Sequence, residues 1–266
     1  MRDTVSNLIA RLDDSSVQET RIIPWGSPVP SFGNLSRSSV ATLGLNPSNR
    51  EFVDERGREL MGTVRRFHTL SSLGLSRWRD AKSEHLQMIV DSCNTYFCRN
   101  PYDGWFKRLE ELISGTRASY YGTGQSACHL DLIPYATSSK WSELSSGQRT
   151  ALLGMAGDTL GLLLRDSPVR LLILNGQTVV QSLLQIADID LERKLMPTWT
   201  LPRKRGEGIS GYSYAGRLRK VGGVKLKKEI VLLGFNHNIQ SSFGVTTGVK
   251  AAIGNWITCA ARGAVA

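Results

Sequence analysis

The sequence predicts an α/β protein in which an open, mostly parallel four-stranded sheet is flanked by helices in a three-layer arrangement. Apolar runs of strand length recur along the chain, each ending in a polar cluster, at residues 39–45, 129–134, 170–174 and 229–235. Apolar residues with helical spacing occupy residues 5–12, 105–113, 145–164 and 178–187. Such alternation of strands and helices is typical of a mostly parallel sheet.

The first strand, residues 39–45, delivers an amide side chain to its own exit. The run stops at Gly44 and Pro47, and proline cannot donate to a strand ladder, so Asn46 lies on a stiff turn. Open α/β sheets place their chemistry at such strand exits. The alternative is an Asx turn, in which Asn46 only bonds nearby backbone.

The other strands also end in polar side chains. Asp131 follows the second run, Asn175 or Gln177 the third, and His237 the fourth. Because the carboxyl ends of parallel strands lie along one edge of a sheet, we expect these side chains to converge with Asn46 on one crevice.

A basic insertion, residues 203–228, separates the third and fourth strands. It carries nine Lys or Arg residues and one acid, Glu207, and so holds most of the excess in a net charge of +10. Its glycines favour a twisted hairpin over a helix. Charge of this kind indicates a polyanionic partner such as DNA, the alternative being a solvated loop. The basic residues assigned to DNA contact are Arg203, Lys204, Arg205, Arg217, Arg219 and Lys220.

The length of 266 residues, with 41% hydrophobic residues and 9 prolines, favours one folded domain over residues 1–266, with residues 1–36 as an N-terminal extension. No stretch approaches the ~20 apolar residues of a membrane span. We therefore expect a cytoplasmic protein with no membrane partner.

The four cysteines, Cys93, Cys98, Cys128 and Cys259, form no recognisable zinc pattern with the four histidines. We expect neither a metal nor a cofactor, and buried free thiols. An iron–sulfur cluster on all four cysteines is the alternative.

Taken in order, the first two strand ends resemble motifs of the uracil-DNA glycosylase superfamily, whose members cut the N-glycosidic bond of a base flipped out of DNA. GLNPS at residues 44–48 is similar to the turn that supplies the residue positioning the hydrolytic water, which is Asn46 by this match. CHLD at residues 128–131 resembles the strand that ends on the base-reading Asn, here Asp131.

The later strand ends continue the resemblance, which covers residues 39 to about 256. LLILNG at residues 171–176 is similar to the third, structural strand. LLGFNHN at residues 232–238 resembles the last strand, ending on the histidine, here His237, that precedes a DNA-wedging loop. The resemblance implies a uracil-DNA-glycosylase-like fold.

The chain also departs from that pattern. His237 is followed by Asn238 rather than by proline, which leaves Ile239 as the candidate wedge residue. Phe52 and Phe67 are candidates for stacking on the flipped base. The stretch 49–74 is similar to a branch found beside bacterial defence genes, whose members remove hypermodified pyrimidines from phage DNA.

The chemistry assigns roles to three of these residues. The Asn46 carbonyl oxygen would orient water, although an amide is a poor general base. His237, if neutral and donating, would stabilise charge on the departing base, unless it is an ordinary histidine. Asp131 only accepts hydrogen bonds when ionised, so it would favour the amino group of cytosine over the O4 of uracil. A helix cap or a salt bridge to Arg50 is the alternative for Asp131.

The sequence therefore predicts a monofunctional DNA glycosylase that hydrolyses a hypermodified cytosine, such as glucosylated 5-hydroxymethylcytosine in phage DNA, and leaves an abasic site. Ser48, Asn49 and Tyr135 are assigned to substrate binding, and Trp141 to a space for a bulky substituent. The alternatives are a repair glycosylase for uracil or damaged bases and a non-catalytic DNA-binding relative.

Overall fold

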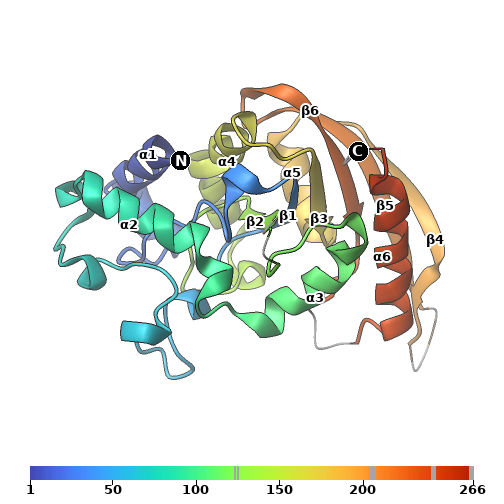
Figure 1. Ribbon diagram of the computed structural model, residues 1–266, viewed down its shortest axis with the longest axis horizontal. Coiled ribbons are helices and arrows are strands. Elements are labelled where there is room, and N and C mark those ends of the chain that lie inside the picture. The colour runs from blue at the N-terminus through green and yellow to red at the C-terminus, as the bar shows by residue number, and fades with distance from the viewer. Residues whose placement is uncertain (123, 125, 204–205, 207, 241–243, 264–266) are drawn as a thin grey trace.

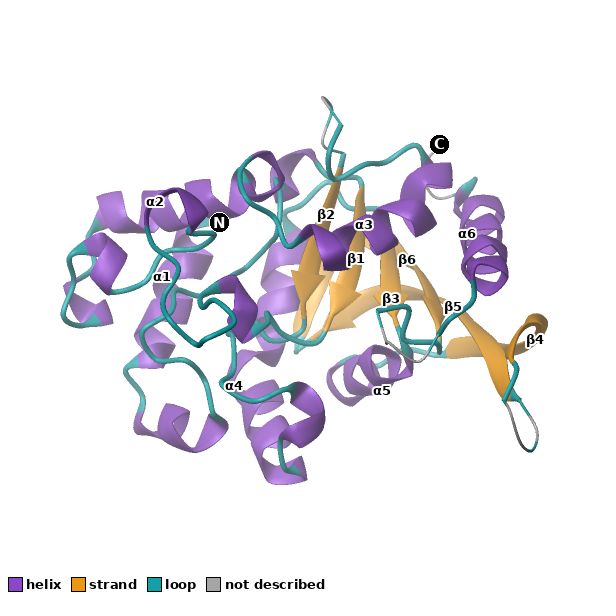
Figure 2. Ribbon diagram, turned by 90° about the horizontal axis from the view of Figure 1, so that it is seen from below, coloured by secondary structure: helices purple, strands orange, loops and turns teal. Residues whose placement is uncertain are grey.

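The computed structural model describes residues 1–122, 124, 126–203, 206, 208–240 and 244–263. In this part of the chain one mixed sheet has helices on both faces (Figures 1 and 2). The strands are β1 (Val40–Gly44), β2 (Ala127–Asp131), β3 (Leu171–Asn175), β4 (Leu191–Leu201), β5 (Ile209–Val221) and β6 (Val224–Phe235). The α-helices are α1 (Arg2–Leu12), α2 (Ser83–Asn94), α3 (Asp103–Ile113), α4 (Ser146–Arg165), α5 (Gln177–Ile186) and α6 (Thr247–Ala261).

The α/β class is confirmed, but the expectation of four strands is wrong, because the described residues form a six-stranded sheet of order β2-β1-β3-β6-β5-β4. The four predicted runs are β1, β2, β3 and β6, and their mutual pairings are parallel. Two antiparallel strands, β5 and β4, continue the sheet beyond β6. Most of β4 is solvent-exposed, so it lacks the apolar run that marks a buried strand.

The predicted insertion 203–228 is not an appendage to the sheet. Most of it belongs to β5 and to the first half of β6, which the glycine turn Gly222–Gly223 joins into the expected hairpin. Both glycines have positive φ, of 54° and 78°, a conformation that favours glycine. The glycines that argued against a helix therefore serve this turn and the strand β5.

Alternating strand residues supply a core on each face of the sheet. Leu43, Leu130 and Leu172 are buried with the apolar residues of α1, α4 and α5. Val40 and Ile173 point to the other face and are buried with those of α3 and α6. This arrangement is the expected helix–sheet–helix layering.

The N-terminal segment is part of the fold. The helix α1 buries Val5 and Leu8 in the first of these cores. The Arg11 guanidinium donates to both carboxylate oxygens of Asp158 in α4, each at 2.7 Å. Bidentate pairing of this kind fixes both distance and orientation. The predicted helix over residues 5–12 is confirmed, and it anchors the extension to α4.

Two of the four cysteines differ from the expectation of buried free thiols. Cys93 and Cys128 are buried, as expected, but Cys98 and Cys259 are exposed. Among the residues that the structure describes, no group of three or more His, Cys, Asp or Glu side chains is arranged to hold a metal ion. Within the same residues, no helix has both the length and the apolar character that crossing a bilayer requires.

Candidate active site

The carboxyl ends of the parallel strands border one cleft of about 550 Å³. The arrowheads of these strands lie at one edge of the sheet in Figure 2. The amino ends of α3 and α5 complete the cleft. Its volume is that of small-ligand pockets. The polar lining residues are Asn46, Ser48, Glu51, Tyr102, His129, Asp131, Asn175, Gln177, Thr178, Asn236, Asn238 and Gln240.

Asn46 lies in this cleft on the turn after β1. Its Nδ2 donates to the Pro47 carbonyl oxygen at 3.1 Å and to the Thr137 hydroxyl at 3.0 Å. The amide thus bonds nearby backbone, as in the simpler alternative, and also ties the turn to the loop after β2. Because its bonds to described residues are donated by Nδ2, the Oδ1 oxygen is left to accept from a ligand or water.

Asp131 lies at the end of the neighbouring strand β2, and its partner is His129 rather than Arg50. The His129 Nε2 lies 3.3 Å from the Asp131 Oδ1, and both side chains are buried. Arg50 instead pairs with the exposed Glu55 at 3.3 Å. Residues two apart on a strand share a face, so the pattern His-Leu-Asp already contained this pairing.

A buried chain of hydrogen bonds continues behind His129. Its Nδ1 lies 2.7 Å from the Thr42 hydroxyl, which lies 2.6 Å from the Tyr120 hydroxyl. The indole of Trp105 meets the imidazole edge-on, with ring centroids 4.8 Å apart. These contacts fix the imidazole, and through it the carboxylate of Asp131.

Gly44 makes room for this pair. In the parallel register Gly44 lies beside Asp131. A Cβ atom at Gly44 would stand 2.3 Å from the Asp131 Oδ1 and 2.8 Å from the His129 Nε2. The glycine of GLNPS is therefore required by the carboxylate on the neighbouring strand.

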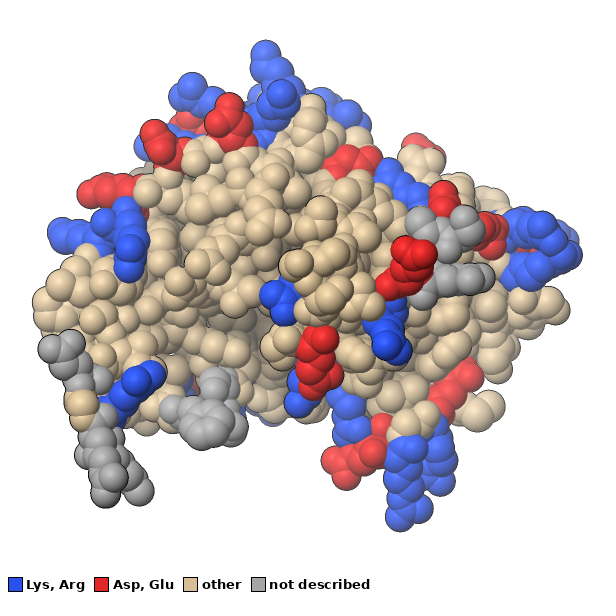
Figure 3. All heavy atoms as spheres, turned by 180° about the vertical axis from the view of Figure 1, so that it is seen from behind, with Lys and Arg blue, Asp and Glu red and all other residues tan. Residues whose placement is uncertain are grey.

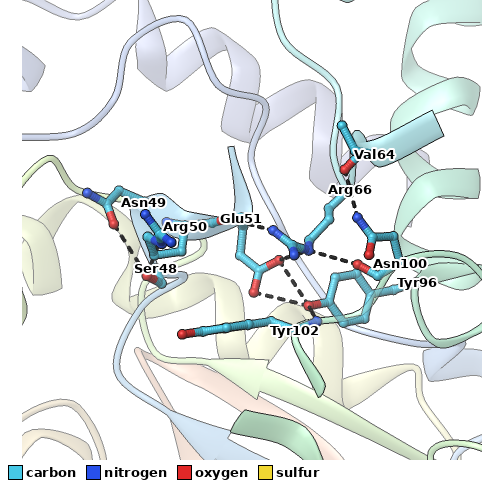
Figure 4. Close-up of polar contacts among 9 residues, drawn as sticks. All are labelled: Ser48, Asn49, Arg50, Glu51, Val64, Arg66, Tyr96, Asn100 and Tyr102. Atoms are coloured by element: carbon cyan, nitrogen blue, oxygen red, sulfur yellow. Dashed lines mark hydrogen bonds and ion pairs between the residues drawn. The ribbon is translucent and has the colours of Figure 1, made fainter. Parts of the chain in front are cut away.

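Glu51 is a lining residue that the sequence did not single out. It ends the short 3-10 turn Asn49–Glu51 and is only 3% exposed. The Tyr96 hydroxyl lies 3.0 and 2.9 Å from its two carboxylate oxygens, and the Arg66 Nε lies 3.8 Å away (Figure 4). Burial raises the pKa of Glu51 to about 7. No local sequence pattern indicated this environment, because it is formed by Tyr96 and Arg66.

The predicted stacking residues do not line the cleft. Phe52 and Phe67 are each 1% exposed and belong to a buried aromatic cluster, in which Phe67 stacks on Tyr96 with ring centroids 5.2 Å apart. Their side chains are core because this face of the sheet is packed with rings. The aromatic lining comes from Phe32, Tyr102, Trp105 and Phe106 instead.

His237 and Ile239 also lie away from the cleft lining. His237 is buried and its Nε2 lies 2.7 Å from the Trp199 carbonyl oxygen, while burial lowers its pKa. A neutral ring that donates to this carbonyl cannot also serve the cleft through Nε2. Ile239 is 2% exposed within the core, so it is not a projecting wedge. The neighbouring Asn238 and Gln240 line the cleft instead.

The remaining substrate assignments divide between two hollows and the core. Ser48 lines the cleft and also an adjoining hollow of about 310 Å³, which Asn49, Lys140 and Trp141 line. Tyr135 is buried and its hydroxyl donates to the Leu8 carbonyl oxygen at 2.7 Å. Tyr135 therefore anchors α1 and does not face a ligand.

The basic residues of the hairpin are separated from the cleft. The turn between β5 and β6 lies at the amino end of β6, whereas the cleft lies at its carboxyl end. Arg217 and Arg219 pair with Glu229, at 2.5 and 2.6 Å. Lys and Arg gather together with acids at the end of the molecule that is uppermost in Figure 3. Arg217, Arg219 and Lys220, which the sequence assigns to DNA contact, therefore lie toward the amino end of β6 and away from the cleft.

Arg203 has a different position. It is exposed in the connection from β4 to β5. That end of the hairpin lies beside the cleft, because the lining residue Asn236 donates to the Ser210 carbonyl oxygen at 2.9 Å and accepts from the Tyr212 N–H at 2.8 Å. Lys204 and Arg205 lie outside the described residues.

The cleft thus brings together an oriented amide, two buried carboxylates, a fixed imidazole and an aromatic wall. Carboxyl groups and amides that converge on one hollow are the components of acid–base and hydrolytic chemistry. Comparison of the chain with models of protein families and with curated proteins found no match.

Proposed function

We propose that the protein is a DNA glycosylase that hydrolyses the N-glycosidic bond of a modified pyrimidine in this cleft. The observation that carries the proposal is that Asn46 and Asp131, at the ends of two neighbouring strands that resemble glycosylase motifs, line one cleft. Glycosidic cleavage passes through an oxocarbenium-like sugar. It needs a positioned water and stabilisation of charge on the departing base.

Asn46 supports the first requirement. Its Nδ2 is held by Pro47 and Thr137, so its Oδ1 has a fixed direction from which to accept a hydrogen bond from water. For the second requirement, the amino end of α5 opens on the cleft at Gly176 to Thr178. The positive end of a helix dipole favours negative charge developing beside it. This end takes the role that the sequence assigned to His237.

Asp131 supports a cytosine-type base. A carboxylate held by His129 accepts hydrogen bonds and so favours an exocyclic amino group over a carbonyl oxygen. A good base-edge pair contributes about 1–3 kcal/mol of discrimination. The adjoining hollow beside Trp141 offers room for a substituent on the base, such as the sugar of glucosylated 5-hydroxymethylcytosine. Removal of such a base from phage DNA is the biological role that we propose.

The test is release of base from labelled DNA containing uracil, thymine, cytosine, 5-hydroxymethylcytosine or its glucosylated form, scored as alkali-labile abasic sites. We expect cleavage at the glucosylated cytosine and its loss in Asn46→Ala, with binding retained. Asn255→Ala, an exposed position on α6, is the matched control. Release at uracil instead would support a repair glycosylase, and binding without release of any base would support a non-catalytic relative.

A second variant tests the substrate. Asp131→Asn restores the amide that the resembling uracil enzymes carry at this position. It loses the charge that favours an amino group, so we expect the preference for the cytosine-type base over uracil to fall by roughly 10- to 100-fold. Competition between the two bases in one reaction measures the ratio. An unchanged ratio would remove Asp131 from base recognition.

A further inference from the structure

Glu51 is an ionisable side chain of the cleft that the roles above leave unused. Its carboxylate is buried yet lines the same cleft as Asn46 and Asp131. A buried carboxylate is costly unless it is paired and hydrogen-bonded, and Tyr96 and Arg66 provide both kinds of contact. Figure 4 shows the carboxylate directed toward Tyr96 and Arg66 and away from Ser48 and Asn49.

The hydrogen bonds around Glu51 form a fixed cradle. The Tyr96 hydroxyl donates toward the carboxylate and accepts from the Tyr102 N–H at 2.9 Å. Arg66 is itself held, since its guanidinium donates to the Asn100 and Arg50 carbonyl oxygens, each at 2.7 Å. Because Tyr96 and Arg66 are themselves held by other hydrogen bonds, the Glu51 side chain keeps one rotamer during a reaction.

Burial and three neighbouring groups act on the pKa of Glu51 in opposite directions. Burial has the largest effect and raises its pKa to about 7, Arg66 and the Tyr96 hydroxyl act to lower it, and the charge of Asp131 acts to raise it. Two carboxylates on one cleft disfavour simultaneous ionisation. A carboxyl group that titrates near neutrality exchanges protons in both directions at physiological pH.

We propose that Glu51 is the general base of the cleft, which takes a proton from the attacking water and returns it to the departing base. This inference rests on the proposed glycosidic hydrolysis. The water oxygen bonds to C1′ while the C1′–N bond breaks and its electron pair goes to the base. The water proton passes to the Glu51 carboxylate and then to the base anion, which regenerates the carboxylate. Asn46 then needs only to orient the water.

The first test is single-turnover base release by Glu51→Gln across pH 5 to 9, a substitution that keeps the shape and the acceptor for Tyr96. A positioned general base contributes roughly 10²- to 10⁴-fold. We expect a loss of that size. We also expect the rate of the unmodified protein to rise as pH increases through about 7, and this rise to be absent in Glu51→Gln. Glu55→Gln is the control, because it removes the same charge from the same segment at a side chain that is 91% exposed.

Two further variants separate a proton-transfer role from a structural one. Tyr96→Phe removes a donor that stabilises the carboxylate, so the rise in rate should move to higher pH. Asp131→Asn removes a repelling charge, so it should move to lower pH. A structural role would change the rate equally at all pH values and move neither profile, which would overturn the inference. If the unmodified protein releases base and Glu51→Gln shows the same pH profile, only the role of Glu51 is overturned. If the unmodified protein releases no base from any substrate, the proposed glycosylase function is overturned.

Discussion

At the scale of single residues, the absent side chain of Gly44 matters as much as the carboxylate that it accommodates. In Gly44→Ala the new Cβ atom would clash with the side chains of Asp131 and His129. We expect a destabilisation of about 1–3 kcal/mol from overpacking, and reduced base release because the pair must shift. Gly104→Ala, in the first turn of α3 with open space around it, is the control and should stabilise by about 0.5–1 kcal/mol. Denaturant unfolding of both variants measures the contrast.

The buried carboxyl of Glu51 makes stability depend on pH. Its folded pKa of about 7 lies above its usual value of 4.5. The folded protein therefore keeps a proton that the unfolded chain releases, and stability falls as pH rises from 4.5 to 7. The shift corresponds to about 3 kcal/mol. We expect Glu51→Gln to gain this amount relative to the unmodified protein between pH 4 and 8.

Comparing the unfolding free energies of two proteins at each pH removes the contributions of the ionisable groups that both proteins share. His68 is buried and its pKa is lowered to about 4, so its effect has the opposite sign, with stability rising as pH increases from 4 to 6.5. This contribution is the same in both proteins and cancels. If Glu51→Gln and Glu55→Gln show the same pH dependence of unfolding, folding does not raise the pKa of Glu51.

A residue of the site could be predicted from the sequence only where its neighbours in the chain decide its position. Asn46 and Asp131 follow apolar runs directly, so the strand pattern alone placed them at one edge. Glu51 is buried by Tyr96 and Arg66, which are distant in sequence, and no local pattern reports that. Tertiary contacts likewise decided that Phe52 fills the core, because a ring after a turn looks the same whether it faces a ligand or a neighbour.

At the scale of elements, the loop after β2 joins the cleft to the N-terminal helix. Tyr135→Phe removes the hydroxyl that donates to the Leu8 carbonyl oxygen of α1. Loss of a buried hydrogen bond that leaves one partner unsatisfied costs about 1–3 kcal/mol. We expect that loss of unfolding free energy with unchanged base release. Reduced release without a change in stability would return Tyr135 to substrate binding.

The strands show why the sheet was only partly predictable. Apolar runs identified β1, β2, β3 and β6, which are buried among neighbours. Strand β4 lies at the edge of the sheet and exposes most of its side chains, so its sequence carries no apolar run. The carboxyl end of β6 was located correctly, but the directions of His237 and Ile239 depend on Trp199 of that unrecognised strand and on α6.

At the scale of the whole molecule, exposed basic residues lie at two opposite ends of the sheet. The turn of the β5–β6 hairpin presents exposed Lys220 and Lys225 at the edge of the sheet away from the cleft. Arg203 is exposed in the connection after β4, at the same end of the sheet as the carboxyl end of β6, and Lys140 is exposed and lines the hollow that adjoins the cleft. DNA that inserts a base into the cleft has to approach from this end of the sheet, so we expect its phosphates to pass nearer to the second pair. The net charge of +10 alone does not distinguish the two ends.

The salt dependence of DNA binding distinguishes them. Each phosphate neutralised by a side chain contributes roughly 0.9 to the slope of log affinity against log salt. If DNA crosses the cleft edge, the double variant Arg203→Gln with Lys140→Gln lowers that slope by roughly 1.8, because two contacts are lost. Lys220→Gln with Lys225→Gln removes the same charge from the far edge and should leave the slope unchanged. The reverse result would place DNA along the hairpin turn, too far along β6 for its bases to reach Asn46 and Asp131, and the cleft would then need a ligand other than DNA.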